Sequence, residues 1–228
     1  MTSEMKGVLF DLDGTLIDSA PDLHNCINKV LIDNNKEKIN FSKLRKLISQ
    51  GSEAIIKGCF DDHLENSTIQ RLRDQFWEYY SKSLTDKTKV FPNIDLVLNN
   101  LTEKSVPWGI VTNKIERFAK PIIEHFRWDK HATTLIYGDT LTASKPSPEP
   151  LLMAAEQLKI KPENCIYVGD TSTDVTAARA ARMTSIVVGY GYSDLDLNEL
   201  KKIADHFINK VIELNKIIFE KKTYNNGS

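Results

Sequence analysis

A chain of 228 residues, 41% hydrophobic and 27% charged, is long enough for one large domain or for a core that carries an insert. A net charge of −1 excludes a generally basic face, so no nucleic acid partner is expected. No segment approaches the roughly 20 apolar residues that span a bilayer, and the first residues lack the apolar stretch of a signal peptide. Three scattered cysteines without metal-ligand spacing agree with reduced thiols. We therefore expect a cytoplasmic protein with no membrane partner.

The chain opens on a short apolar run, residues 8–10, which leads directly into Asp11 and Asp13, with Gly14 behind them. A buried strand that ends in two carboxylates is costly unless a cation lies between them, because unpaired buried charges are destabilising. A hard divalent cation such as Mg²⁺ takes oxygen ligands, often together with a phosphate. The carboxyl ends of strands are also where open α/β sheets place their sites. Taken alone, Asp-Gly equally indicates a tight turn after a strand.

Helical spacing without a convincing strand characterises residues from about 21 to 87. Pro21 suits the first turn of the first helix, with Ser19 or Asp18 as its cap. A second apolar face is broken by Gly51, and further helical segments follow. This block predicts a small all-helical unit of three to five helices.

After residue 91, apolar strands alternate with helices, which predicts a parallel sheet with right-handed crossovers. The expected strands after the first cover residues 108–112, 134–137, 165–168, 185–188 and 205–208. The first strand then belongs to the same sheet, and the helical block is inserted over its carboxyl end, where it is placed to act as a lid. The expected domains are residues 1–17 and 88–228 for the core and residues 18–87 for the cap.

Polar residues follow the expected strands, and one more stands at the start of a Pro-rich loop. They are Asp11, Asp13, Thr112, Asn113, Lys114, Lys145, Asp170 and Asp174. In a doubly wound sheet such strand ends meet at one edge. Each also has a plain structural interpretation: Asp170 caps a helix, Asp174 favours its first turn, and Lys145 is a solvated loop lysine. For all of these plain structural interpretations to hold together, several unrelated coincidences would be needed.

The order of these segments resembles the haloacid dehalogenase superfamily. Residues 11–15 match its first motif, Thr112 its second, Lys145 its third, and Asp170 with Asp174 its fourth. The resemblance covers nearly the whole chain. It implies an α/β fold with a Rossmann-like parallel sheet core and an inserted all-helical cap domain. It also implies a Mg²⁺-dependent phosphomonoesterase that acts on a small-molecule phosphate ester.

The same resemblance implies roles for the matched residues. Asp11 is expected to be the nucleophile that forms an aspartyl-phosphate, and Asp13 the general acid and base. Thr112 and Asn113 are expected to hydrogen-bond the transferring phosphoryl group. Lys145 is expected to neutralise the charge on the nucleophile and the phosphate, so that two anions can approach.

Ligand sets for the metal and the substrate follow from this assignment. The expected Mg²⁺ ligands are Asp11, Asp13 through its backbone carbonyl, Asp170 and Asp174, the last of which is also placed to tune Lys145. The expected substrate ligands are Thr112, Asn113, Lys114 and Lys145 from the core, and Arg45, Gly51 and Ser52 from the cap. For the cap residues a solvated helical surface is the plain alternative. Glu53 and Lys57, at i,i+4 spacing, are expected to be only a surface pair.

Within the superfamily, Asp13 favours phosphate-ester hydrolysis or a phosphomutase over dehalogenation. Residues 11–23, 144–151 and 166–170 resemble the phosphoglycolate phosphatase group, whereas residues 108–119 look like the N-acetylmuramic acid 6-phosphate phosphatases of cell-wall recycling. The first expected substrate is 2-phosphoglycolate and the second is the amino-sugar phosphate. A general sugar-phosphate or nucleotide phosphatase, a phosphomutase, a protein phosphatase and a non-catalytic binding module stay open, as does the oligomeric state, monomer or homodimer.

Overall fold

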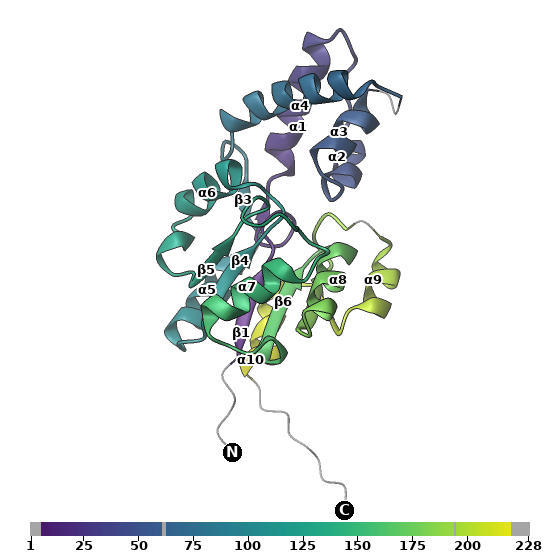
Figure 1. Cartoon of the computed structure of the whole chain (residues 1–228). Helices are drawn as coiled ribbons and strands as arrows, with labels where there is room; N and C mark the ends of the chain where they lie inside the picture. The colour runs from purple at the N-terminus through teal and green to yellow at the C-terminus, as the bar shows by residue number, and fades with distance from the viewer. Residues whose placement is uncertain (1–5, 61–62, 194, 220–228) are drawn as a thin grey trace, which may run out of the picture.

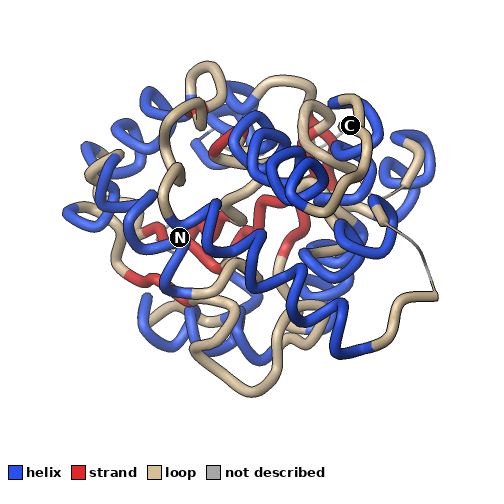
Figure 2. Tube along the Cα trace, turned by 90° about the horizontal axis from the view of Figure 1, so that it is seen from above, coloured by secondary structure: helices blue, strands red, loops and turns tan. Residues whose placement is uncertain are grey.

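The computed structural model describes residues 6–60, 63–193 and 195–219. These residues form an α/β core and, above it in Figure 1, a group of helices that stands apart from the sheet. Seen from above in Figure 2, helices lie on both sides of the strands. The predicted fold class, a parallel sheet core with an inserted helical block, is therefore confirmed.

The described residues build a central sheet of six parallel strands in the order β5-β4-β1-β6-β7-β8. The strands are β1 (Gly7–Phe10), β4 (Trp108–Val111), β5 (Thr134–Ile136), β6 (Cys165–Gly169), β7 (Thr184–Val188) and β8 (His206–Ile208). Every residue of β1 is buried, as expected for a central strand that helices cover on both faces. All the predicted strands are present, and the last one forms the edge of the sheet.

Helices pack on the two faces of this sheet through separate apolar clusters. In β1, Val8 and Phe10 point to one face and Leu9 to the other, since side chains alternate along a strand. Phe10 meets Trp108 edge to face, with ring centroids 6.4 Å apart. The core helices are α5 (Ile94–Glu103), α6 (Glu116–His125), α7 (Glu149–Leu158), α8 (Ser172–Ala180), α9 (Leu197–Ile203) and α10 (Leu214–Phe219). The sequence analysis did not anticipate the last two, which are short.

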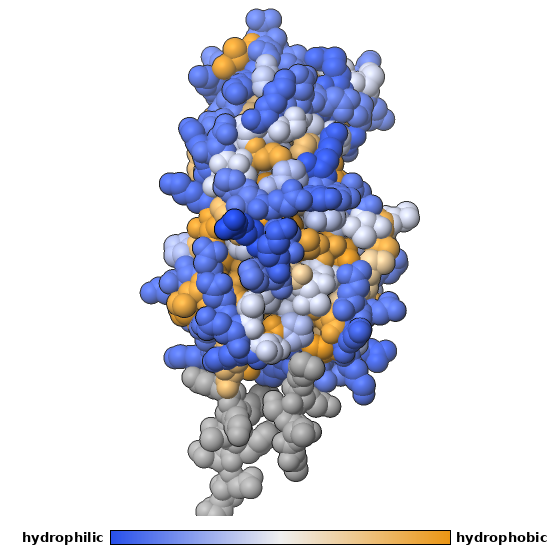
Figure 3. Space-filling model, turned by 90° about the vertical axis from the view of Figure 1, so that its left-hand side faces the viewer, coloured by the Kyte–Doolittle hydropathy of each residue, from blue (hydrophilic) through white to orange (hydrophobic). Residues whose placement is uncertain are grey.

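The inserted block consists, among the described residues, of four helices with an apolar cluster of their own. They are α1 (Ala20–Asp33), α2 (Phe41–Ile48), α3 (Ser52–Cys59) and α4 (Asn66–Ser81). The prediction of three to five helices without a strand is confirmed. Gly51 has φ +87°, a backbone conformation that side-chain-bearing residues rarely adopt, and so separates α2 from α3. On the face seen in Figure 3 this helical cap is mostly hydrophilic.

No helix in the described part of the chain combines the length and the apolar character needed to cross a bilayer. The longest one, α4, is amphipathic and belongs to the cap. It packs one face onto α1, in the cluster that contains Phe76 and Tyr80.

Two short strands that the sequence analysis missed connect the cap to the core. Strand β2 (Ile17–Asp18) pairs antiparallel with β3 (Lys89–Val90), so the outgoing and returning chain segments lie side by side. Two residues are too few to produce the alternating pattern by which a strand is recognised. The domain boundaries at residues 18 and 87 stay a prediction, and this ribbon lies next to both.

The carboxylate of Asp22 links the outgoing and the returning chain segments through hydrogen bonds. It is buried at the start of α1 and accepts hydrogen bonds from the backbone N–H of Lys87 at 2.9 Å and of Thr88 at 2.7 Å. The Thr88 hydroxyl donates a further bond of 2.7 Å. Because hydrogen bonds to an ionised acceptor are stronger than neutral ones, this acid holds the base of the cap in place.

We expect Asp22→Asn to lower the free energy of unfolding by about 1–3 kcal/mol, because an amide replaces a charged acceptor and brings donors towards buried N–H groups. Chemical denaturation followed by circular dichroism measures this. The matched control is Asp86→Asn, an exposed acid in the same loop, which should change stability little. Equal stability of the two variants would contradict the structural role given to Asp22.

Candidate active site

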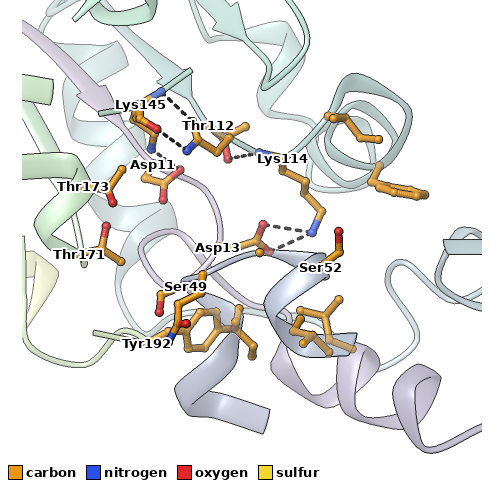
Figure 4. A pocket seen from close by; sticks show the side chains of 18 of the residues that line it. Asp11, Asp13, Ser49, Ser52, Thr112, Lys114, Lys145, Thr171, Thr173 and Tyr192 are labelled. Carbon is orange, nitrogen blue, oxygen red and sulfur yellow. Dashed lines mark hydrogen bonds and ion pairs between the residues drawn. The ribbon is translucent and has the colours of Figure 1, made fainter. Parts of the chain in front are cut away.

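A cavity of about 290 Å³ lies between the carboxyl edge of the sheet and the cap. This volume is close to the lower end of the range for small-molecule sites, about 300–1,000 Å³. The core residues that line it include Asp11, Asp13, Thr112, Asn113, Lys114, Lys145, Asp170 and Asp174. The predicted polar residues that follow separate strands are thus brought together at one site, as Figure 4 shows for those that it labels.

Asp11 follows β1 directly, and its backbone N–H donates to the Val168 carbonyl at 2.8 Å. One carboxylate oxygen, Oδ1, is paired with the Lys145 ammonium at 3.0 Å and has no further hydrogen-bond partner among the described residues. Burial raises the pKa of Asp11 to about 6, against the lowering effect of the Lys145 charge. The carboxylate therefore has acceptor capacity that its protein neighbours do not use.

Three acids approach one another around this point. Asp11, Asp170 and Asp174 each offer a carboxylate oxygen, and these oxygens lie within 4.8 Å of one another. Burial, and then the charges of the other two acids, raise the pKa of Asp170 well above its usual range. Three carboxylate oxygens at this spacing fit a hard divalent cation, which takes oxygen ligands. Such a cation would lower these pKa values again, since an adjacent positive charge favours the ionised form.

Asp174 has a second task that distinguishes it from the other two acids. Its Oδ2 accepts from the Thr171 N–H at 3.1 Å while its own N–H donates to the Thr171 hydroxyl oxygen at 3.4 Å, which forms a capping box at the start of α8. Its Oδ1 accepts from Lys145 Nζ at 2.7 Å and from the Tyr167 hydroxyl at 3.2 Å. Although burial acts in the opposite direction, the Lys145 charge lowers the pKa of Asp174. The interpretation of Asp174 as a first-turn acid is correct, and the residue also orients the lysine.

Lys145 is buried between two acids. Its ammonium lies 3.0 Å from Asp11 Oδ1 and 2.7 Å from Asp174 Oδ1, and it donates to the Tyr167 hydroxyl at 2.6 Å. Although burial opposes it, the charges of these acids raise the pKa of Lys145. Asn113 fixes the lysine's backbone: its amide accepts from the Lys145 N–H at 3.0 Å and donates to the Lys145 carbonyl at 2.9 Å. The solvated-loop interpretation of Lys145 is therefore wrong.

Thr112 is buried at the end of β4, and its hydroxyl accepts from the Lys114 N–H at 3.2 Å. In Figure 4 it lies between a side of the cavity that holds Asp11 and Lys145 and a side that holds Asp13 and Lys114. The Thr112 hydroxyl thus accepts one hydrogen bond and keeps its own proton for a further acceptor.

Asp13 turns its side chain away from the three-acid group. Both of its oxygens accept from Lys114 Nζ, at 3.1 and 3.0 Å, and Oδ1 also accepts a short hydrogen bond from the Ser19 hydroxyl. Lys114 in turn donates to the hydroxyl of Tyr80, a cap residue, at 2.7 Å. The expected role of the Asp13 backbone carbonyl as a metal ligand stays a prediction. Ser19 is the N-cap residue of α1, as expected, but its hydroxyl bonds Asp13 and not the helix backbone.

The turn after Asp13 allows very close packing against Asp170. Gly14 has φ +81°, and a Cβ there would lie 2.1 Å from Asp170 Oδ2. The same oxygen accepts from the Tyr192 N–H at 2.6 Å. A glycine is needed at this turn because any larger residue would displace the acid.

The cap residues predicted as substrate ligands divide into two groups. Gly51 and Ser52 line the cavity, at the start of α3. Arg45 is not among the lining residues; its guanidinium donates to the carbonyls of Tyr190 and Gly191, both at 2.9 Å. The expected surface pair of Glu53 and Lys57 is confirmed, at 2.7 Å.

Three tyrosines of the site were missed from the sequence: Tyr80, Tyr167 and Tyr192. Tyr80 continues an apolar helix face and Tyr167 lies in an apolar strand, where a tyrosine is most simply explained by packing, and Tyr192 lies in a glycine-containing loop. A buried tyrosine hydroxyl needs a hydrogen-bond partner, and this need is the one signal that could have indicated a polar site nearby.

Comparison with known proteins agrees with this geometry. The family model of haloacid dehalogenase-like hydrolases matches residues 8–188. A phosphoglycolate phosphatase of Xanthomonas campestris pv. campestris (strain 8004) is 37% identical over 209 residues, which cover 92% of this chain and 94% of that protein. The N-acetylmuramic acid 6-phosphate phosphatase of Pseudomonas putida (strain KT2440) is 32% identical over 214 residues, covering 94% and 96%.

A solved structure gives the same result for the fold. The crystal structure of a predicted phosphoglycolate phosphatase from Haemophilus somnus 129PT superposes with a TM-score of 0.86 at 26% identity, covering 95% of this chain and 99% of that one. The match extends through both the sheet and the inserted helices. The chain therefore belongs to the haloacid dehalogenase-like hydrolase family, in which it is a phosphatase, a phosphoric monoester hydrolase of the phosphoglycolate phosphatase group.

Proposed function

We propose that this protein is a Mg²⁺-dependent phosphomonoesterase that hydrolyses 2-phosphoglycolate through an aspartyl-phosphate. The observation that carries the proposal is Asp11, a partly buried carboxylate whose Oδ1 has the Lys145 ammonium, 3.0 Å away, as its close partner among the described residues. A nucleophile needs a free lone pair aimed at the substrate, and phosphoryl transfer needs positive charge close to it.

In the proposed reaction an Asp11 oxygen forms a bond to phosphorus while the bond from phosphorus to the ester oxygen breaks. Asp13 gives a proton to that leaving oxygen and then takes one from water, which attacks the aspartyl-phosphate. This releases phosphate and regenerates both carboxyl groups in their starting states. Asp11 and Asp170 would hold Mg²⁺, which when bound neutralises charge on the phosphoryl oxygens.

The remaining core residues position the phosphoryl group. Lys145 supplies positive charge next to the nucleophile and is itself held by Asp174. The hydroxyl of Thr112, buried between the two sides of the cavity, is placed to donate to a phosphoryl oxygen. Donors that are already fixed in place stabilise the transition state without reorganising.

The substrate assignment rests on chemistry at the leaving-group side. Lys114 is a second buried cation there, and 2-phosphoglycolate carries a carboxylate next to its ester carbon. The cavity of about 290 Å³ suits a small metabolite. Relatives described as phosphoglycolate phosphatases reach 40% identity, over 89% of this chain, in Xylella fastidiosa (strain Temecula1).

A second candidate substrate is N-acetylmuramic acid 6-phosphate. Beside the polar residues of the α2–α3 turn, the cap contributes an apolar and aromatic wall of Leu23, Ile48, Ile55, Phe76 and Trp77, next to Phe118 of the core. 2-Phosphoglycolate has almost no apolar surface to place against such a wall, whereas an acetylated sugar has more. The Pseudomonas relatives described as phosphatases of this sugar are 31–32% identical to this chain.

We expect Asp11→Asn to reduce phosphate release by at least about a thousandfold, because the amide is not a nucleophile. The loss should be of turnover and not of folding, so isothermal titration calorimetry should still detect substrate binding. Asp33→Asn, an exposed cap acid, serves as the control with normal turnover. Substantial activity in Asp11→Asn would exclude the aspartyl-phosphate route.

We expect Mg²⁺-dependent phosphate release to favour 2-phosphoglycolate over N-acetylmuramic acid 6-phosphate by at least about tenfold in kcat/KM, with EDTA abolishing both. Glucose 6-phosphate and AMP test a general sugar-phosphate or nucleotide phosphatase. A phosphomutase would return a phosphorylated isomer in place of free phosphate. Preference for the amino sugar would make the second candidate the substrate, and no release from any compound would favour a binding module.

We expect Asp170→Asn to raise the Mg²⁺ concentration for half-maximal activity by at least about tenfold, because an amide donates less charge to a hard cation. The measurement is phosphate release over a Mg²⁺ titration. Asp95→Asn, on an exposed helix surface, should leave the titration unchanged. An unaltered Mg²⁺ requirement in Asp170→Asn would remove this residue from the proposed metal site.

A further inference from the structure

Each of the two buried lysines at the cavity is held by an acid and by a tyrosine hydroxyl. Lys145 donates to Tyr167 at 2.6 Å, and Lys114 donates to Tyr80 at 2.7 Å. The two tyrosines differ in where their own proton goes. The Tyr167 hydroxyl donates to the Val111 carbonyl at 2.8 Å, so its hydrogen-bonding capacity is used within the protein.

The hydroxyl of Tyr80 has a proton that no described residue accepts. Its oxygen receives a hydrogen bond from Lys114, and a lysine ammonium can only donate. The phenol proton must therefore point elsewhere, and Tyr80 lines the cavity. A buried donor left without an acceptor is costly, so a ligand that supplies one gains affinity there.

The position of this hydroxyl is fixed by apolar packing. Tyr80 is only 2% exposed, and its ring stacks on Phe76 and meets Phe118 of the core helix α6 edge to face, with centroids 6.3 and 5.3 Å away. Lys114 Nζ lies 4.6 Å from the centre of the same ring. Burial raises the pKa of Tyr80 to about 12, so the phenol keeps its proton at neutral pH.

A cation also lies on this side of the cavity. Among the described lining residues the cations are Lys114 and Lys145. Lys145 is committed to Asp11 and Asp174, whereas Lys114 faces a single acid, Asp13. In Figure 4, Lys114 and Ser52 lie on the side of Asp13 away from Lys145. A negative group on the leaving alcohol would therefore share the Lys114 ammonium with Asp13.

We propose that Tyr80 and Lys114 together bind a carboxylate on the leaving group, with Tyr80 donating its hydroxyl proton to a carboxylate oxygen. The proposal rests on the phosphatase function proposed above. It makes Tyr80, a cap residue, specificity-determining: it distinguishes phosphate esters of hydroxy acids from esters of neutral alcohols. It also explains why a tyrosine stands at a helix position where phenylalanine would pack equally well.

The test compares Tyr80→Phe with the wild type on 2-phosphoglycolate and on ethyl phosphate, which has a methyl group in place of the carboxylate. We expect kcat/KM for 2-phosphoglycolate to fall about tenfold or more, because a hydrogen bond to a charged group is lost. For ethyl phosphate it should change by no more than about twofold. Tyr79→Phe is the matched control, since that hydroxyl bonds Asp33 on the exposed cap surface, and it should alter neither substrate.

Calorimetric titration of the Asp11→Asn variant, with and without Tyr80→Phe, repeats the comparison without turnover. Selective loss of 2-phosphoglycolate affinity on removal of the hydroxyl supports the proposal. Equal losses on both esters, or no loss on either, would overturn it. Wild-type protein that releases phosphate from neither ester would instead count against the proposed enzyme function, while the titrations still decide the role of Tyr80.

Discussion

Repulsion between buried carboxylates is the constraint on which the rest of the structure depends. Four acids line one cavity, and among the described residues two lysines face them. Lys145 compensates Asp11 and Asp174, and Lys114 compensates Asp13, while the close partners of Asp170 are the neutral donors Thr15 and Tyr192. The ionised lining carries an excess of two negative charges, which a divalent cation would cancel. Such a site is stable only with its cation or with protons on some acids.

The sheet makes this crowding possible. β1 lies between β4 and β6, so the strand that delivers Asp11 is flanked by those that deliver Thr112 and Asp170. Parallel strands end at the same edge, and a central strand has neighbours on both sides. The apolar packing of Phe10 and Leu9 on the two faces fixes the height at which the acids emerge. Substitutions in that packing would act on the site through position rather than charge.

Most of the sheet and the core residues of the site were predictable, because they follow from hydrophobic periodicity and from the order of the motifs along the chain. Apolar strands that end in polar residues identified Asp11, Thr112 and Asp170, and the Pro-rich loop at the start of a helix identified Lys145, without any knowledge of distances. A single sequence does not show which partner a side chain contacts when several partners are within its reach. Arg45 was expected to contact substrate, and the structure directs it to two backbone carbonyls instead.

Other elements escaped prediction for reasons of length and context. The ribbon of β2 and β3 has two residues a strand, which is too short for any periodic signal. Tyr80 continues the apolar face of α4, so its packing role concealed the hydroxyl at its tip. The cap was foreseen as a lid, yet its chemical contribution could be seen only once a helix and a strand end distant in sequence were placed together.

The same ribbon has an evolutionary consequence. Because Ile17 pairs with Val90, the two ends of the inserted segment lie side by side before and after the cap. An insert whose ends are adjacent costs the host little loop-closure entropy, whatever its length. Helical blocks of different size can therefore replace one another at this position without altering the sheet. The chemistry is encoded in the sheet core and the selectivity in the inserted cap. The cap can therefore change in evolution while the catalytic core is kept.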